Sequence, residues 1–263
     1  MYSLEHISYL KKLKTYKFLV RFTQIIIIVF LIVLWQLAAD FNLINTFISS
    51  SPKAVITTII KLYSSGDLFY HIWVTFYEVI ISFILGTTLG LTIATLLWRF
   101  KFLSKVLDPY LTVLNSLPKV SLGPIIIIIA GAGTKSIILM ALFISVIITI
   151  MDIEVAFNNT DQNKIRLLQS FKAKRRQIYF KLILPSNFKN IISVLKVNLS
   201  LTFIGVIMGE FLVSKAGVGY LIMYGSQVFN LNLVVTGIII LAFMASIMYY
   251  FILFIEKRLS KNR

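Results

Sequence analysis

The sequence DQNKIRLLQSFKAKRRQIYFKLILPSNFK, residues 161–189, is a basic and polar segment between two long apolar runs. It holds eight of the 26 Lys and Arg residues of the chain. Because each flanking run is long enough to cross a bilayer, the segment is predicted to be an internal loop of a membrane protein. The spacing of Ile165, Leu168 and Phe171 predicts a short helix in its first half, and Leu184-Pro185 marks the start of the next helix.

Composition excludes several classes of protein. The chain is 58% hydrophobic, whereas soluble domains have about 45–50% apolar residues. It has no cysteine, and His6 and His71 are too few and too far apart for a metal centre, so we expect no metal and no cofactor. The sequence lacks a GxxxxGK[ST] motif for ATP binding and an HExxH motif, which argues against an enzyme.

Apolar runs of about 20 residues predict an all-α membrane protein with six transmembrane helices. The expected spans are Phe22–Ala39, Thr75–Trp98, Leu111–Ala132, Ser136–Ile153, Ile191–Val213 and Val234–Ile255.

The distribution of basic residues predicts the orientation of these spans. Twenty of the 26 Lys and Arg residues lie at the two termini, in residues 99–105 and in residues 161–189, which six spans place on one side. The opposite loops hold only four lysines. The positive-inside rule therefore predicts cytoplasmic termini and a cytoplasmic 161–189 loop in a cell-membrane protein. The basic excess is explained by topology and by attraction to anionic membrane lipids, not by nucleic-acid binding.

This topology divides the chain into three parts. Residues 1–68 comprise a basic cytoplasmic start, the first span and an external amphipathic helix that Ser51 caps and Pro52 opens. The first span is expected to be a retained helix, not a cleaved signal peptide. Residues 69–255 form the main transmembrane domain with the loop at 161–189, and residues 256–263 form a cytoplasmic tail.

Two patterns within the spans concern helix packing. Ser82, Gly86, Gly90 and Ala94 recur every four residues in the second span, which predicts close approach of a neighbouring helix, with substrate contact as the alternative. Pro118, together with Gly123 and Pro124, is expected to break or kink the third span. This break is either a simple kink or part of a translocation pathway, because freed backbone needs cover from protein or water.

Charged and polar residues near the span ends give further candidates. Glu210 is expected either to hold the neighbouring segment 217–219 by hydrogen bonds or to act as a gate. Glu78 is expected to lie at the level of the lipid headgroups. Lys196 and Asn198 in the fifth span form a candidate anion site, although Lys196 is close enough to the cytoplasmic interface to snorkel.

The 161–189 loop resembles the coupling loop of type I ABC importer permeases, also called binding-protein-dependent transport inner-membrane components. In that family the loop reads Glu-Ala-Ala, three residues, Gly, nine residues and Ile-x-Leu-Pro. Aligned on Leu184-Pro185, the Gly position holds Lys172, the Glu-Ala-Ala positions hold 166–168 and the Ile position holds Leu182. The Gly normally permits a turn between two short helices, whereas Lys172, followed by Ala173, can remain helical.

Further motifs, in the family's order and spacing, make the chain similar to the nitrate/sulfonate/taurine branch over roughly residues 48–255. They are Ser51-Pro52, Asp108-Pro109, Leu117-Pro118-Lys119, Gly123-Pro124, Ala130-Gly131-Ala132-Gly133, Gly209-Glu210-Phe211 and Gly217-Val218-Gly219-Tyr220-Leu221-Ile222.

The resemblance implies the type I importer fold and a role as the membrane subunit of an ATP-driven importer of a small, anionic solute. It implies three protein partners: a cytoplasmic ABC ATPase at the loop, an extracytoplasmic solute-binding protein and a second permease copy. The expected loop contacts are Ile165, Arg166, Leu168, Gln169, Phe171, Lys172, Ala173 and Pro185, with Leu168 and Phe171 as anchors. The candidate pathway or gate residues are Glu210, Asn198, Lys196 and Pro118.

A secondary transporter or channel driven by an ion gradient is the alternative. Such a protein would favour a buried charge relay and discontinuous helices in paired halves. The middle of each predicted span is almost free of charge, and no internal repeat is visible.

Overall fold

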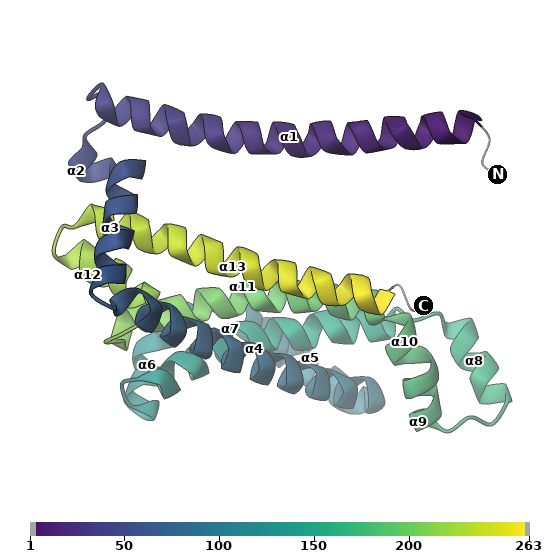
Figure 1. The fold of residues 1–263 in the computed structure, drawn as a ribbon. Helices are drawn as coiled ribbons and strands as arrows, with labels where there is room; N and C mark the ends of the chain where they lie inside the picture. The colour runs from purple at the N-terminus through teal and green to yellow at the C-terminus, as the bar shows by residue number, and fades with distance from the viewer. Residues whose placement is uncertain (1–3, 261–263) are drawn as a thin grey trace.

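The computed structural model describes residues 4–260, and side chains for residues 12–258. Every regular element within this range is helical (Figure 1). The elements are α1 Leu4–Asp40, α2 Thr46–Ser49, α3 Pro52–Ser64, α4 Asp67–Arg99, α5 Lys101–Ser116, η1 Lys119–Leu122, α6 Gly123–Ala130, α7 Thr134–Asn158, α8 Gln162–Ser170, α9 Arg175–Ile178, η2 Tyr179–Ile183, α10 Leu184–Ser186, α11 Phe188–Val213, α12 Val218–Gln227 and α13 Leu231–Ser260.

Five helices of the described chain are long and apolar enough to cross a membrane. These are α1, α4, α7, α11 and α13, and they contain five of the six predicted spans. The third predicted span, Leu111–Ala132, is not one continuous helix, as its proline residues indicated. That region is α5 followed by η1 and α6, and the chain bends by 88° between α5 and the segment made of η1 and α6. Only the two parts together are long and apolar enough to form a sixth span.

The bend follows from the residues at 117–118. Leu117 leaves the helix with extended dihedral angles, as residues before a proline prefer, and Pro118 precedes η1 with φ −70° and ψ 84°. Pro118 has no amide hydrogen to continue the α5 hydrogen-bond ladder. The predicted break is therefore present, and Pro118 lies exposed at its corner.

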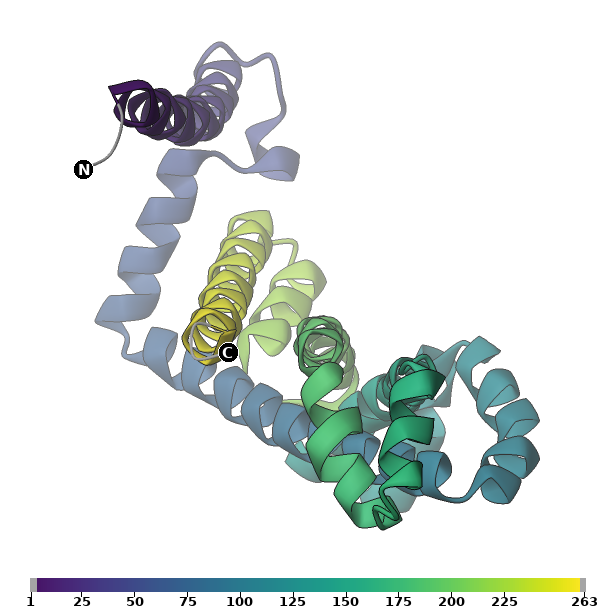
Figure 2. The same ribbon diagram turned by 90° about the vertical axis from the view of Figure 1, so that its right-hand side faces the viewer.

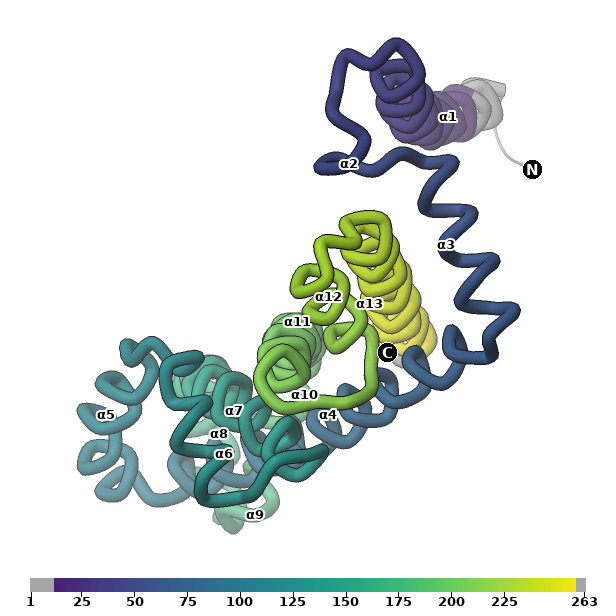
Figure 3. Tube along the Cα trace, turned by 90° about the vertical axis from the view of Figure 1, so that its left-hand side faces the viewer, coloured from purple at the N-terminus to yellow at the C-terminus, as the bar shows by residue number. Residues whose placement is uncertain are grey.

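The centre of the bundle is built from α4, α7 and α11, with α12 and α13 packed beside α11 (Figures 2 and 3). All four residues of the predicted small stripe, Ser82, Gly86, Gly90 and Ala94, are buried on α4. A methyl group on Gly90 would lie 2.5 Å from Cγ2 of Thr149 on α7. The small residues thus let α7 approach α4 closely, as helices must pack in lipid, where tails supply no hydrophobic drive.

Helix α1 stands apart from this bundle (Figures 2 and 3). None of its most apolar stretch is buried against the rest of the described chain. Its tether is a hydrogen bond from the Lys53 amide at the start of α3 to Oε1 of Gln36, 3.0 Å long. Helix α3 begins as predicted, with Ser51 Oγ accepting from the Ala54 amide at 3.2 Å and Pro52 in its first turn.

The two ends of the bundle carry different elements (Figure 1). The start of α1 and the end of α13 lie at the same end as α8 and α9, and α3, α6 and α12 lie at the other end. This arrangement agrees with a topology in which both termini and the 161–189 loop share one side.

Candidate functional site

The 161–189 loop folds into a helical hairpin at one end of the bundle (Figure 1). Helix α8 begins at a cap in which Oδ1 of Asp161 accepts a hydrogen bond from the Asn163 amide at 2.9 Å. It ends near Phe171, and the chain turns back into α9, η2 and α11. The predicted short helix in the first half of the loop is confirmed.

Lys172 makes the turn of this hairpin in the left-handed conformation, with φ +57°. The amide of Lys172 donates to the carbonyl of Gln169 at 2.8 Å, and the amide of Ala173 donates to the carbonyl of Leu168 at 3.0 Å. This pair of bonds is the Schellman pattern, in which the left-handed residue is usually Gly. The expectation that Lys172 could stay helical is therefore wrong, and the turn of the family's Gly survives with Lys in its place.

One apolar face of α8 packs against the subunit itself. Ile165 and Leu168 are half-buried and, with Ala173, pack against a buried cluster that includes Phe157 and Ile178. Their role is to fix the hairpin to its own subunit. Leu168 was expected to anchor a partner together with Phe171, and in this subunit it is partly occupied by packing against its own core.

The outward edge of the hairpin is apolar. Leu167 is 57% exposed and Phe171 is 74% exposed, one helical turn apart. Arg166, Gln169 and Lys172 are exposed as well. Leu167 is thus the residue that sequence reasoning missed, and Phe171 keeps its predicted position on the surface.

A buried hydrogen-bond clamp closes the base of the loop. Nδ2 of Asn187, at the start of α11, donates to Oγ1 of Thr160 at 2.7 Å and to the carbonyl of Ile183 at 3.0 Å. Both side chains are buried. Pro185 lies in α10, directly after the π-helical turn η2. The clamp joins the end of α7 to the start of α11, so the hairpin is held by two bundle helices.

Glu210 forms the centre of a second polar site, at the opposite end of α11. Its side chain is 1% exposed. Oε1 accepts a hydrogen bond from Oγ1 of Thr75 at 2.6 Å, and Oε2 accepts one from the Gly219 amide at 2.5 Å. The Val218 amide donates to Oγ1 of Thr75 at 2.7 Å. The hydrogen bond that the first interpretation of Glu210 requires is therefore present.

Gly217 and His71 complete this network. Gly217 has φ +109°, and its amide donates to Nδ1 of His71 at 2.9 Å. A methyl group on Gly217 would lie 2.4 Å from Cδ of Glu210, and one on Gly219 would lie 2.6 Å from Oε2. The glycines let the chain pass directly over the carboxylate. Nothing in the sequence links Thr75 and His71 to Glu210, because they are 135 or more residues away in the chain.

Glu78, which was expected at the level of the lipid headgroups, is 1% exposed and lies beside Glu210 within the bundle. Neither of its oxygens has a hydrogen-bond partner of normal geometry among the described residues. It lines a pocket of about 400 Å³ together with Thr134, Ser214 and Lys215. Glu78 lies three helical turns after the start of α4 at Asp67.

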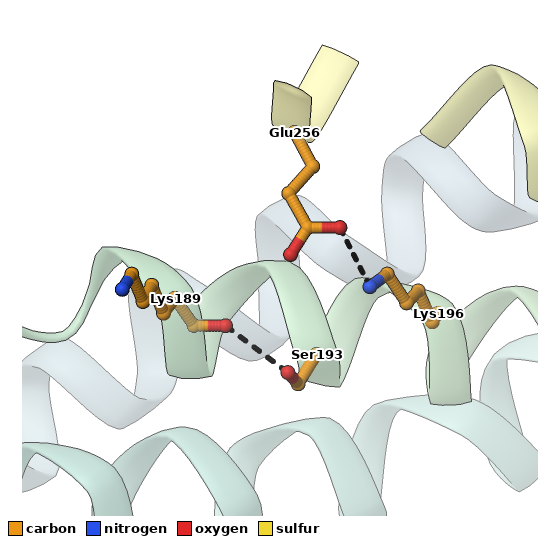
Figure 4. Close-up of polar contacts among 4 residues, drawn as sticks. All are labelled: Lys189, Ser193, Lys196 and Glu256. Atoms are coloured by element: carbon orange, nitrogen blue, oxygen red, sulfur yellow. Dashed lines mark hydrogen bonds and ion pairs between the residues drawn. The ribbon is translucent and has the colours of Figure 1, made fainter. Parts of the chain in front are cut away.

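The remaining candidates separate in space. Nζ of Lys196 pairs with Oε2 of Glu256 on α13 at 2.7 Å (Figure 4). Asn198 is fully buried on another face of α11, where its Nδ2 donates to Oγ1 of Thr87 at 3.1 Å and its Oδ1 accepts from Thr202. The structure therefore does not bring Lys196 and Asn198 together as an anion site, and Lys196 already has a counter-charge.

Replacing Glu210 with Gln tests the network at the external end. The amide supplies one acceptor oxygen where two are used, so an NH₂ group must face either the Gly219 amide or Thr75. Leaving a buried donor unpaired costs about 1–3 kcal/mol. We expect E210Q to insert normally and to lower uptake roughly tenfold or more, measured with labelled solute in vesicles. Thr75→Val should act in the same direction, and Thr75→Ser should keep activity. Wild-type uptake by E210Q would remove Glu210 from the functional site.

The long apolar helices, with the helical hairpin and the bent third span, are those of a multi-pass membrane protein. Residues 86–261 match the family described as "Binding-protein-dependent transport system inner membrane component". The chain belongs to this family, the permeases of ABC importers, and ATP hydrolysis resides in a separate subunit. It is thus a multi-pass membrane protein and not an enzyme.

Among its relatives is a Bacillus subtilis protein named as an aliphatic sulfonates transport permease, SsuC. That protein is 30% identical over 89% of this chain and 84% of its own length. The taurine transport system permease protein TauC of Escherichia coli is 20% identical over 88% of this chain and 86% of its own length. A structure of the MetNI methionine ABC transporter in an inward-facing conformation has the same fold, with TM-score 0.61 and 20% identity over 72% of this chain and 93% of the solved chain.

Proposed function

We propose that this chain forms the translocation pathway of an importer for a small anionic solute of the sulfonate, taurine or nitrate type. Relatives named for aliphatic sulfonates, taurine and nitrate support this class. Other relatives are named for riboflavin and for formylaminopyrimidine, which are the alternative solutes. The sulfonate-type relative in Bacillus subtilis reaches 30% identity over 89% of the chain, which favours a sulfonate.

The observation that carries the coupling role is the outward apolar edge of the hairpin. Leu167 and Phe171 are exposed on α8 and at its end, and the Asn187 clamp and the packing of Leu168 hold the hairpin to the bundle. Exposed aromatic and aliphatic side chains on a rigid element are typical anchors of a protein interface. The partner is a cytoplasmic ABC ATPase, whose closure on ATP moves the hairpin and, through it, α11.

A second copy of this chain is the proposed partner within the membrane. Helix α5 has no buried residue in this subunit, and Ile128 and Ile129 on α6 are 83% and 79% exposed. The 88° break between these helices leaves backbone groups that a bilayer cannot satisfy. A second subunit and a water-filled pathway at Pro118 would cover them.

The proposed orientation places α8 and both termini in the cytoplasm and α3, α6 and α12 outside. An extracytoplasmic solute-binding protein would then meet the end of the bundle that carries Glu210 and Lys215. Cysteines introduced singly at Ser51 and at Lys135 should react with an impermeant thiol reagent added to whole cells, since the chain has no cysteine of its own. A cysteine at Lys174 should react only after the membrane is opened. Labelling of Lys174→Cys in intact cells would reverse the orientation.

Reconstitution tests the whole proposal. The subunit, its ATPase and its binding protein are placed in liposomes with ATP inside, and uptake of labelled alkanesulfonate, taurine and nitrate is compared with that of riboflavin. We expect uptake of an anion that requires both ATP and the binding protein. Uptake that instead follows a proton or sodium gradient without ATPase would support the secondary transporter, and uptake of riboflavin alone would replace the solute class.

A further inference from the structure

Basic side chains converge without counter-charges at the end of α4, near the hairpin. Arg99, Lys101 and Arg175 line a pocket of about 360 Å³ under α8. Nη1 of Arg175 donates to the backbone carbonyl of Arg99 at 3.2 Å, which holds the Arg175 guanidinium against the end of α4. Within the described residues the one ion pair joins Lys196 to Glu256, so none of these three cations has an acidic partner.

No acidic side chain is among the residues that line this pocket. Three positive charges around one pocket repel each other unless an anion joins them. The pocket therefore has the charge of an anion site, and the chain itself supplies no anion for it.

An apolar groove continues directly from this pocket. Its volume is about 350 Å³, and it shares Arg99 and Arg175 with the basic pocket. The rest of its lining includes Leu96, Phe100 and Tyr179. Trp98 borders both spaces. An amphipathic aromatic between an apolar groove and a basic pocket marks the level of the membrane interface.

We propose that these adjoining spaces bind one anionic phospholipid, with its phosphate between Arg99 and Arg175 and an acyl chain against Leu96, Phe100 and Tyr179. A basic pocket at the cytoplasmic end of transmembrane helices suits such a headgroup. Arginine forms paired, charge-assisted hydrogen bonds to phosphate oxygens. A free phosphate would fill the pocket but leave the groove empty, and an acidic side chain of the ATPase would do the same.

The position of the site links lipid binding to the hairpin. Arg99 is the last residue of α4, and Arg175 is the first residue of α9 in the hairpin. A phosphate between them joins a membrane-spanning helix to the segment that contacts the ATPase. The lipid thereby holds the hairpin in place, and its loss weakens the coupling between ATP hydrolysis and transport.

The test uses the purified full-length subunit in detergent. Phosphatidylglycerol is expected to raise the thermal unfolding midpoint and to remain bound in native mass spectrometry. Phosphatidylcholine of the same chain length, and inorganic phosphate or glycerol phosphate, should do neither. The double variant R99Q/R175Q should retain phosphatidylglycerol roughly tenfold less, because two charges near the headgroup are lost.

Matched variants separate the outcomes. Lys172→Gln with Lys174→Gln removes the same number of charges, but neither lysine lines either space, so this variant should keep the lipid effect. Arg99→Lys with Arg175→Lys preserves the charge and should keep most of the lipid effect. This variant tests the site even if R99Q/R175Q folds poorly. An equal shift with inorganic phosphate would overturn the lipid assignment. Unchanged lipid retention by R99Q/R175Q would also overturn the lipid assignment. If that variant kept its lipid but lost the ATPase, the pocket would be a binding site for the ATPase.

Discussion

A subunit that carries Leu167→Asp together with Phe171→Asp is expected to reach the membrane at the normal level and to lose its ATPase. Both side chains are exposed in this subunit, so the substitutions cost little in its own folding. In the complex they would place two carboxylates in a desolvated contact. Hot-spot losses of about 2 kcal/mol or more at each position imply roughly a thousandfold weaker association. ATP-dependent uptake should vanish.

The measurement is co-purification of the ATPase from solubilised membranes, with uptake into vesicles as the functional readout. Leu167→Met with Phe171→Leu keeps the apolar edge and should retain both binding and uptake. Leu168→Asp should behave differently, because Leu168 packs against the subunit's own core. Its expected effect is a lower unfolding midpoint of the isolated subunit. Normal ATPase binding by the double Asp variant would move the coupling contact away from this edge.

The second large effect is expected from Gly205→Ala on α11. A methyl group at Gly205 would lie 2.4 Å from Cα of Ala141 on α7, closer than any real contact. Because the obstacle is backbone, the two helices must separate. Alanine is otherwise favoured over glycine within a helix by about 1 kcal/mol, so helix propensity predicts the opposite sign. Overpacking typically costs 1–3 kcal/mol, and displacement of a central helix pair should reach at least the upper end of that range.

Thermal unfolding of the purified subunit in detergent checks this prediction. Gly205→Ala should lower the midpoint, and Gly205→Leu should leave little monodisperse protein. Ser200→Ala is the matched control, because Ser200 lies on the same helix but is exposed, and it should change the midpoint little. A stabilised Gly205→Ala would mean that α7 and α11 are not in close contact.

The sequence predicted most of the fold for a simple physical reason. A bilayer demands long apolar helices, so five of the six expected spans correspond to single helices. Close packing in lipid needs small residues, so Gly86 and Gly90 indicated a close neighbour on α4, and the structure shows that this neighbour is α7. The position of the break in the third span followed from Pro118. The angle of the break could not be predicted, because a proline determines where a helix ends and not the direction of the next helix.

The candidate sites were harder to predict. Leu167 and Leu168 are identical in type and adjacent, so apolar spacing could not decide which one faces inward. Lys172 has no intrinsic preference for a left-handed turn, and only the alignment with the family's Gly indicated one. Glu78 and Glu210 lie on different helices, and their proximity depends on tertiary packing that no local pattern encodes. By contrast, Glu210 and the glycines at 217 and 219 are close in the chain, and their contact was foreseen.

Helix α11 gives the molecule a mechanical property. It runs without interruption from Phe188, beside the Asn187 clamp, to Val213, beyond Glu210. Its 26 residues correspond to about 39 Å, so a rigid tilt of about 10° displaces one end by roughly 7 Å relative to the other. A small rotation imposed on the hairpin would therefore displace the far end of α11 by more than the length of the hydrogen bonds that hold Gly219 and Thr75 to Glu210. Loss or addition of one of these bonds would therefore change how firmly the far end of α11 is held to α4 and α12.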